Sequence, residues 1–213
     1  MPASVPSMRR IAVLVSGSGT NLVALLEAIA ADPAFGGEVV VVVSDQPTAG
    51  GLEQARRRDL PVAAVPLADH PDRAAWEVAL TATVATHAPD VVVLAGFMRV
   101  LSERFLRNWP DRVLNTHPSL LPAFRGAHAV RDALAYGVKV TGATVHLVDE
   151  QVDNGPIVAQ TCVPVAPDDT EASLHTRIKA VEHELLPACV KLLCRDRLRI
   201  EGRTVHVLPE ELP

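Results

Sequence analysis

The chain has 213 residues, of which 48% are hydrophobic, a length and composition typical of one globular domain and unlike a disordered protein. A formal net charge of −5 and the lack of a basic stripe exclude nucleic acid as an expected partner. The only three-residue basic run, 56–58, is typical of a solvated helix end. Three scattered cysteines, none in a CxxC pair, indicate a reducing compartment, and we expect a cytoplasmic protein.

The first nine residues have no apolar region of the kind found in a signal peptide. We expect residues 1–9 to be a disordered extension, with Met8 as an alternative start. The longest apolar run, residues 91–98, is far shorter than a membrane span, so no membrane partner is expected. Because no repeat, low-complexity tract or linker interrupts the remainder, residues 10–213 are predicted to be a single domain.

The first half of the chain alternates short apolar strands with amphipathic helices. The strands are predicted at 11–15, 39–43, 62–65 and 91–95, and the helices at 21–31, 51–58 and 73–86. This alternation predicts an α/β fold with an open, mostly parallel twisted sheet and helices on both faces, as in Rossmann-like proteins. A further short strand is predicted at 112–114, just before a polar segment.

The second half of the chain has a different pattern. Two longer strands at 140–148 and 157–165 are predicted to pair antiparallel across the loop 149–156. A long helix is predicted to begin at the acidic cap Asp168-Asp169, with Glu171 in its first turn and Pro187 as a kink or interruption. A small hairpin is predicted around residues 199–207.

A glycine-rich loop, Ser16-Gly17-Ser18-Gly19-Thr20-Asn21, separates the first strand from its helix. Glycines permit a tight turn, and the free N–H groups of a helix start attract phosphate. A dinucleotide site fits less well, because the third glycine of that motif is missing and Asp45 lies further along than the usual ribose-binding acid. The sequence therefore favours a single phosphate, with a dinucleotide or a purely structural turn as alternatives.

The octet Asn115-Thr116-His117-Pro118-Ser119-Leu120-Leu121-Pro122 follows the strand at 112–114. In extended chain, Asn115 and His117 point to the same side, which pairs a neutral hydrogen-bond donor with a group that titrates near neutral pH. A carbonyl under nucleophilic attack needs such a donor and such an acid. Asp153, before a Gly-Pro turn, supplies a carboxylate further along the chain. An ordinary turn with a structural histidine is the alternative.

The glycine loop, the segment Gly96-Phe97-Met98-Arg99-Val100-Leu101, the octet and Asp153 together resemble the folate-dependent formyltransferases that act on glycinamide ribonucleotide. The resemblance covers the chain from about Arg10 to its end. It implies a Rossmann-like formyltransferase fold, and transfer of the formyl group of 10-formyltetrahydrofolate to the amine of phosphoribosylglycinamide in purine biosynthesis. The two small molecules are the implied substrates, and a monomer or a homodimer is the implied assembly.

The resemblance also implies roles for individual residues. Asn115, His117 and Asp153 are the implied catalytic residues, and Asp153 is expected to raise the pKa of His117 so that it stays charged near neutral pH. The implied ribonucleotide-binding residues are Gly19, Thr20, Asn21 and Glu182. The implied folate-binding residues are Arg73, Met98, Arg99, Val100, Leu101, Asn115, Asp149, Glu150, Gln151, Val152 and Asp153.

Other readings of the same octet remain to be separated. A formyltetrahydrofolate deformylase carries an extra N-terminal domain, whereas few residues precede the match here. A non-enzymatic nucleotide-binding protein would have no use for all three catalytic residues. No metal is expected, because His117, His128 and His146 lack the spacing of metal ligands and are scattered over separate segments.

Overall fold

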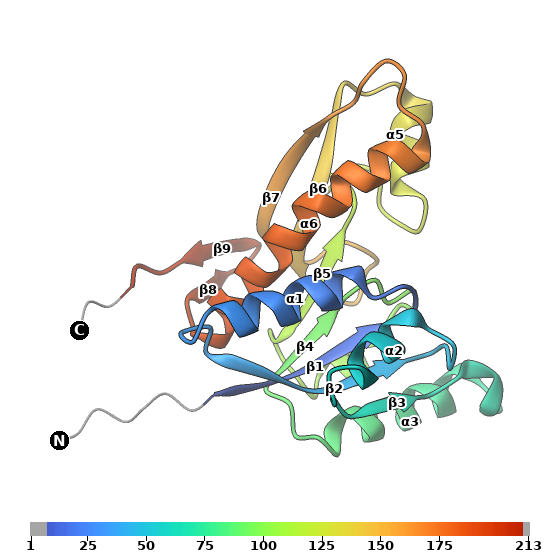
Figure 1. Ribbon diagram of the computed structural model, residues 1–213, viewed down its shortest axis with the longest axis vertical. Coiled ribbons are helices and arrows are strands. Elements are labelled where there is room, and N and C mark those ends of the chain that lie inside the picture. Colours follow the sequence, from blue (N-terminus) through green and yellow to red (C-terminus); the bar gives the residue numbers. More distant parts are fainter. Residues whose placement is uncertain (1–7, 211–213) are drawn as a thin grey trace.

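Residues 8–210 are described by the computed structural model and build a nine-stranded sheet with helices on both faces (Figure 1). The strands are β1 (Arg9–Val15), β2 (Gly37–Ser44), β3 (Val62–Ala64), β4 (Val91–Leu94), β5 (Val113–His117), β6 (Val140–Leu147), β7 (Ile157–Pro164), β8 (Leu198–Glu201) and β9 (Thr204–Val207). The helices are α1 (Thr20–Ala31), α2 (Gly50–Arg56), η1 (Leu67–Asp69), α3 (Arg73–Ala85), α4 (Glu103–Leu106), α5 (Ala129–Tyr136) and α6 (Glu171–Cys194).

The order of strands across the sheet is β3-β2-β1-β4-β5-β6-β7-β9-β8. The neighbouring strands β3, β2, β1, β4 and β5 run parallel, and β6 runs antiparallel to both β5 and β7. The predicted fold class is confirmed, including the antiparallel strands of the second half. The chain moves outward from β1 to β3 and then returns to place β4 on the other side of β1. Ligands of open α/β sheets bind at such a reversal, beyond the carboxyl ends of the strands.

Two apolar cores cover the two faces of the parallel part of the sheet. On one face α1, α2 and α6 pack against β1, β2 and β4, and Figure 1 shows α1 and α6 lying across the sheet together. On the other face α3 and α4 supply Trp76, Leu80 and Phe105. A third, smaller cluster joins α5 and α6 to β6 and β7. The valine-rich strands β2 and β4 are buried on both sides, as their uninterrupted apolar sequences predict.

Several boundaries differ from the sequence-based expectation. Strand β1 begins at Arg9, one residue inside the segment expected to be disordered, and residues 1–7 lie outside the described part of the chain. Strand β5 continues through His117, because β6 supplies antiparallel partners for the polar residues that follow Leu114. The short helices α4 and α5 were not predicted.

The start and course of α6 also differ from the prediction. Its cap is Thr170, which forms a reciprocal capping box with Ser173, so the predicted cap at Asp168-Asp169 is wrong. Asp169 instead accepts hydrogen bonds from the Ser173 hydroxyl and the Ala166 N–H. The helix also passes through Pro187 without interruption. Buried neighbours such as Leu186 and Val190 hold both sides of the proline against the sheet, which offsets one missing hydrogen bond.

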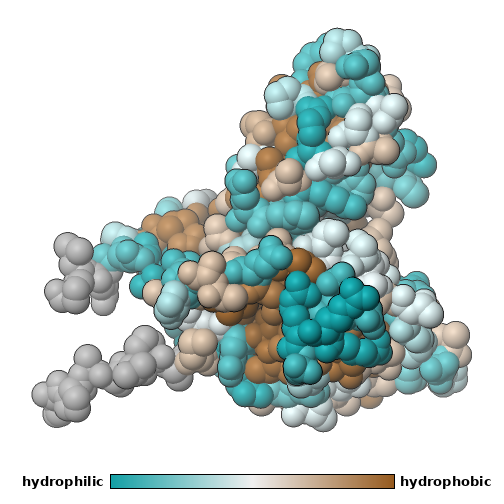
Figure 2. All heavy atoms as spheres, viewed as in Figure 1, coloured by the Kyte–Doolittle hydropathy of each residue, from teal (hydrophilic) through white to brown (hydrophobic). Residues whose placement is uncertain are grey.

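Figure 2 shows hydrophilic side chains gathered over α2 on the face that carries α1. Arg56, Arg57 and Arg58 are exposed there, as the solvated helix end predicts. Arg57 pairs with Glu53 one turn earlier, at 2.9 Å. In the described part of the chain, no helix is both long enough and apolar enough to cross a membrane.

Candidate active site

Asn115 and His117 occupy the last part of β5, where the parallel pairing with β4 ends and the antiparallel pairing with β6 continues. The two side chains share one side of the strand, as their spacing predicts. Thr116 between them points the other way, and its hydroxyl donates a hydrogen bond to Glu182 at 3.0 Å. His117 is buried, with 5% of its surface exposed. The strand therefore presents an amide and an imidazole as a fixed pair.

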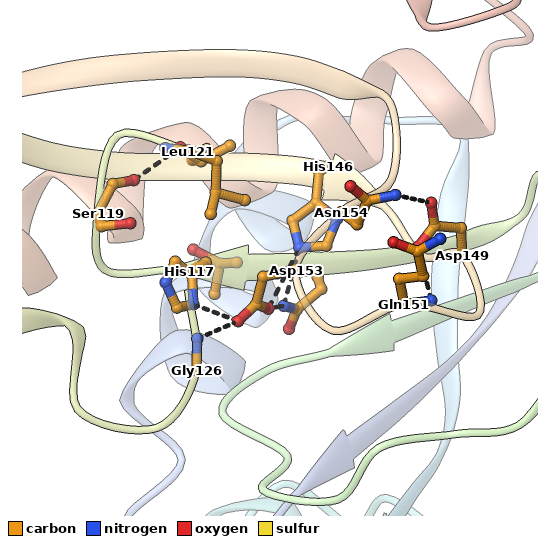
Figure 3. Close-up of polar contacts among 12 residues, drawn as sticks. His117, Ser119, Leu121, Gly126, His146, Asp149, Gln151, Asp153 and Asn154 are labelled. Atoms are coloured by element: carbon orange, nitrogen blue, oxygen red, sulfur yellow. Dashed lines mark hydrogen bonds and ion pairs between the residues drawn. The ribbon is translucent and has the colours of Figure 1, made fainter. Parts of the chain in front are cut away.

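Asp153 is the centre of the polar cluster, and Figure 3 shows it between His117 and His146. Its Oδ2 accepts from the Gly126 N–H at 2.8 Å and lies 3.3 Å from His117 Nδ1. Its Oδ1 lies 3.4 Å from Asn115 Nδ2 and 3.8 Å from His146 Nε2. Its backbone has a φ of 49°, a conformation rare outside glycine, so the loop holds the carboxylate in place at some conformational cost.

The pKa values of this cluster follow from burial and charge together. Burial raises the pKa of Asp153, but contacts with His146, His117 and the Gly126 N–H outweigh burial and hold it below the ordinary value. Burial lowers the pKa of His117, and it outweighs the opposite effects of Asp153 and the Phe124 carbonyl. The expectation that Asp153 keeps His117 charged near neutral pH is therefore wrong for the free protein: the carboxylate acts in the expected direction, but desolvation is larger.

Both ring nitrogens of His117 face acceptors. Nε2 lies 2.8 Å from the Phe124 carbonyl, and Nδ1 faces Asp153. The protonated ring satisfies both acceptors, whereas the neutral ring satisfies only one of them. His117 thus has the surroundings of a proton donor even though its burial favours the neutral form.

His146 belongs to the same cluster, although the sequence-based interpretation assigns it only a structural role. It pairs directly with Asn115 across β5 and β6, and its Nε2 lies 3.1 Å from Asn115 Nδ2. Its Nδ1 lies 2.9 Å from the Leu147 carbonyl, which fixes the tautomer with the proton on Nδ1. In this neutral ring Nε2 accepts from the Asn115 amide, and in a charged ring Nε2 would instead donate toward Asp153 Oδ1, which lies 3.8 Å away. The strand alternation of residues 140–147 could have revealed its direction, but not its partner.

The glycine loop lies at the carboxyl end of β1 and ends in the N-terminus of α1. Gly19 caps the helix with a φ of 79°, and no side chain caps the first N–H groups. A Cβ atom at Gly19 would lie 2.4 Å from the Gly51 Cα atom, so the loop and α2 approach each other too closely for a side chain. Asn21 is buried, and its Oδ1 has no hydrogen-bond partner among the described residues. The uncapped N–H groups at the helix start can donate to an anion, whereas the Asn21 oxygen can only accept.

A row of side chains on α6 faces this loop. His175, Lys179 and Glu182 line the same cavity as Asn21, and their spacing puts them on one face of the helix. Burial raises the pKa of Glu182 and outweighs the opposite effects of the Thr116 hydroxyl and the Asn21 side chain. Sequence reasoning found Glu182 but missed His175 and Lys179, which the helical periodicity of this second row could have indicated.

The segment Met98–Leu101 forms another part of the cavity wall. Met98 is 62% exposed, whereas Leu101 is buried in the core beneath it. Arg73 does not line the cavity: its guanidinium donates to the Val100 carbonyl and lies 6.0 Å from the Trp76 ring centre. Arg73 thus supports this segment from behind.

The loop between β6 and β7 closes one end of the cavity. Asp149 accepts hydrogen bonds from the Gln151 N–H at 3.0 Å and from Asn154 Nδ2 at 2.8 Å, which fold the loop on itself (Figure 3). A Cβ atom at Gly155 would lie 1.7 Å from the Leu147 carbonyl oxygen, so only glycine fits there. Of the predicted folate-binding residues in this loop, Glu150 alone does not line the cavity.

All of these elements surround one cavity of about 470 Å³. Its lining combines the glycine loop, the α6 row, the segment Met98–Leu101 (the folate-type segment) and the β6–β7 loop with Asn115, His117 and Asp153. Within the described residues, no group of three His, Cys, Asp or Glu side chains is placed to hold a metal ion. The arrangement suits two ligands that meet at a reacting carbonyl, one of them anionic at its far end.

An α/β fold of this topology with an Asn-His-Asp cluster at the switch point defines a class of group-transfer enzymes, and residues 9–190 match the formyl transferase family. The chain belongs to this family. It is 52% identical over 204 residues to the phosphoribosylglycinamide formyltransferase of Mycobacterium tuberculosis strain H37Rv, covering 96% of this chain and 93% of that protein. It is 39% identical over 191 residues to the human trifunctional purine biosynthetic protein adenosine-3, covering 90% of this chain and 19% of that longer protein.

Solved structures give the same result. A glycinamide ribonucleotide transformylase from Symbiobacterium toebii superposes with a TM-score of 0.92 at 46% identity, covering 95% of each chain. A formyltetrahydrofolate deformylase from Pseudomonas syringae also superposes, with a TM-score of 0.88, but at 28% identity and over 67% of its own chain.

Proposed function

We propose that the protein is a phosphoribosylglycinamide formyltransferase, which transfers a formyl group from 10-formyltetrahydrofolate to the amine of phosphoribosylglycinamide in purine biosynthesis. The observation that carries this proposal is the shared cavity, which is lined by both a phosphate-type loop and an Asn-His-Asp cluster. The high identity to transformylases over nearly the whole chain supports the same substrates.

The ribonucleotide is expected to bind with its phosphate at the N-terminus of α1, next to Asn21 and opposite Lys179. Its glycinamide amine is then expected near Glu182, whose carboxylate is held by Thr116 and Asn21. The folate is expected to lie along Met98–Leu101 and under the loop 149–153, with its formyl group next to Asn115 and His117. Arg73 and Glu150 are expected to act on the folate site indirectly, since neither lines the cavity.

In the reaction, the neutral amine attacks the formyl carbon, and a carbon–nitrogen bond forms while the carbonyl oxygen becomes negative. Asn115 Nδ2 and protonated His117 are expected to donate to that oxygen. The oxygen would replace weaker acceptors, namely the long contact from Asn115 to Asp153 and the Phe124 carbonyl at His117 Nε2. The bond to folate N10 then breaks, the new amide nitrogen has lost a proton, and N10 has gained one. No covalent enzyme intermediate is needed, and positioning of both substrates contributes much of the rate.

The decisive experiment measures deformylated folate formed from 10-formyltetrahydrofolate, with and without phosphoribosylglycinamide. A transferase releases product only when the amine acceptor is present. Product formed equally without the acceptor would identify a deformylase-like hydrolase, the principal alternative within the same fold. Tight binding of nucleotide with no product in either case would identify a non-enzymatic nucleotide-binding protein. The cytoplasmic location and the assembly as a monomer or homodimer stay predictions.

A further inference from the structure

Asp45, the residue after β2, is a buried carboxylate that touches both substrate-binding segments. It is 2% exposed and does not line the cavity. Its Oδ1 accepts a hydrogen bond from the Ser16 hydroxyl at 2.5 Å, and its Oδ2 accepts one from Arg99 Nε at 2.7 Å. Ser16 begins the glycine loop and Arg99 belongs to the folate-type segment, so one carboxylate joins two neighbouring parts of the cavity wall.

The connection continues through Ser16. Its hydroxyl donates to Asp45 and also accepts from the Met98 N–H at 2.9 Å, while its own N–H donates to the Gly96 carbonyl at 3.1 Å. Because Asp45 can only accept, it fixes the direction of the Ser16 hydroxyl proton and leaves the oxygen lone pairs for Met98. The same carboxylate therefore sets the position of the loop and, through Ser16 and Arg99, of the backbone at Met98.

A merely structural ion pair is a weaker explanation of these contacts. A buried carboxylate is costly unless it is paired, and an apolar residue at this position would avoid the cost. Asp45 is almost completely buried, but its partner Arg99 is 31% exposed and lies in the cavity wall. Its contacts to Ser16 and Arg99 both lead to residues that line the cavity. A charge held there organises the binding surfaces rather than the core.

We propose that Asp45 is a positioning residue that couples the two substrate sites, so that the ribonucleotide and the folate each bind more tightly when the other is present. The proposal rests on the function proposed above. A substrate that orders Ser16–Asn21 also orders Gly96–Leu101 through Asp45, and the second substrate then meets a wall already in place. Such a coupling is reciprocal: each substrate raises the affinity for the other by the same factor.

The chain offers a matched control in Glu77 on α3, another buried carboxylate. Glu77 accepts from the Ser102 N–H at 2.7 Å and from the Ser102 hydroxyl, directly after the folate-type segment. Among the described residues, its carboxylate forms no hydrogen bond with the glycine loop, so it supports only one of the two sites. Loss of Glu77 thus reproduces the loss of a buried carboxylate without breaking the connection between the sites.

The experiment uses calorimetry with two probes, phosphoribosylglycinamide and 5,8-dideazafolic acid, which carries no formyl group. Each is titrated into the protein alone and into the protein saturated with the other. In the wild type, the second ligand is expected to bind more tightly. Asp45→Ala is expected to lower the affinity for both ligands by roughly tenfold or more, as for lost hydrogen bonds to a charged group, and to reduce the mutual effect, with the direct bonds from Ser16 to Met98 and Gly96 left in place. Glu77→Ala is expected to lower the affinity for the folate analogue only.

Two milder variants keep the test decisive if Asp45→Ala does not fold. Asp45→Asn retains an acceptor for Ser16 and is expected to restore ribonucleotide affinity more fully than folate affinity. Arg99→Gln removes the exposed partner of the Asp45–Arg99 ion pair. It is expected to lower the affinity for the ribonucleotide as well as for the folate analogue, although Arg99 belongs to the folate-type segment. If each ligand still raised the affinity for the other as strongly in Asp45→Asn and Arg99→Gln as in the wild type, the proposed role of Asp45 would be wrong, and the proposed function would stand. A wild-type protein that bound neither probe would overturn the proposed function, and the coupling with it.

Discussion

At the scale of single residues, the site depends on a few side chains whose burial and hydrogen bonding oppose each other. His117 illustrates this, since both ring nitrogens face acceptors that favour the cation while its burial favours the neutral ring. Asp153 contacts His117, His146, Asn115 and the Gly126 N–H at once. A change at Asp153 therefore alters the orientation and the charge of the whole cluster.

We expect His117→Ala and Asp153→Ala to lower kcat far more than they raise either KM. Loss of a proton donor typically costs about 10²–10⁴-fold, and loss of an oxyanion donor such as Asn115 about 10²–10³-fold. Because His117 and Asp153 act as a unit, the double variant is expected to be little slower than the slower single variant. Steady-state kinetics of the complete mutant cycle measures this. Fully additive losses would show that the two residues act independently.

The pH dependence of kcat/KM is expected to show that only a small fraction of the protein and substrate is in the reactive protonation state. Activity needs a charged His117 and a neutral substrate amine. Burial puts the pKa of His117 below its ordinary value of about 6.5, and the amine is expected near the value of an α-amino group, about 7.7–8.0. Because the pKa of His117 lies below that of the amine, activity rises with pH up to the pKa of His117, stays level, and falls above the pKa of the amine. The acid break then belongs to His117.

Asp153→Asn removes a charge that raises the pKa of His117, so the acid break is expected to move to lower pH. The level region is expected to fall, because fewer His117 side chains are charged there, and the alkaline break is expected to stay in place. Initial rates with both substrates below saturation, from pH 5 to 9, measure the two breaks. An acid break that did not move would assign Asp153 to orienting the substrates instead. The breaks are macroscopic values of the coupled cluster.

At the scale of secondary-structure elements, the sequence predicted most of what the backbone does locally. The apolar strands, the helix α1 and the terminal hairpin follow from short-range patterns, and they are confirmed within one to three residues. The course of α6 through Pro187 and the extension of β5 through His117 depend on packing partners far away in the chain. The position of His146 beside Asn115 likewise requires the register of β5 and β6, which no local pattern contains.

The glycine loop gives a prediction at this scale. Asn21→Ala is expected to raise the KM for the ribonucleotide about tenfold or more, with little change for the folate, since Asn21 faces the expected phosphate and a hydrogen bond to a charged group is lost. Gly17→Ala is the control in the same loop, because a Cβ there meets nothing within 4 Å. Tight binding of a nicotinamide dinucleotide in calorimetry would contradict a monophosphate site.

Gly19 calls for a different variant and a different measurement. A Cβ atom there would collide with Gly51, and the φ of 79° is unfavourable for any other residue, so Gly19→Ala is expected to lower the Tm as well as the affinity for the ribonucleotide. Thermal unfolding of Gly17→Ala and Gly19→Ala side by side separates the two effects. An equal Tm for both variants would mean that the loop and α2 are free to move apart.

At the scale of the whole molecule, the site lies where the strand order reverses, and every wall comes from a different part of the chain. The glycine loop follows β1, the folate-type segment follows β4, the catalytic pair ends β5 and the α6 row lies near the other end of the chain. The order of the sheet brings these segments together, and the order was not readable from the sequence alone. A residue at such a junction can be kept for substrate binding at a cost to the stability of the fold. Glu182 is such a residue, because it is buried on α6 and contacts Thr116 of β5.

Glu182→Gln is expected to stabilise the substrate-free protein and to lower its affinity for the ribonucleotide. Burial raises the pKa of Glu182 in the folded state. A group whose folded pKa is raised contributes stability below its unfolded pKa, and that contribution is lost as the pH rises through the folded pKa. Deprotonation of Glu182 at high pH therefore places a charge in a buried site, a cost that the amide avoids, while the amide oxygen still accepts from Thr116. The Tm of the variant is expected to exceed that of the wild type by several degrees at pH 8 and by much less at pH 5.

Substrate is expected to reverse this ranking. The ribonucleotide brings its amine to Glu182 and stabilises the wild type in proportion to its affinity, whereas the neutral amide offers the amine a weaker partner. Thermal unfolding of both proteins, with and without phosphoribosylglycinamide at pH 5 and pH 8, measures both effects in one experiment. A variant less stable than the wild type at pH 8 without substrate would show that the carboxylate is well compensated in the fold. Equal stabilisation of both proteins by the ribonucleotide would remove Glu182 from the amine site.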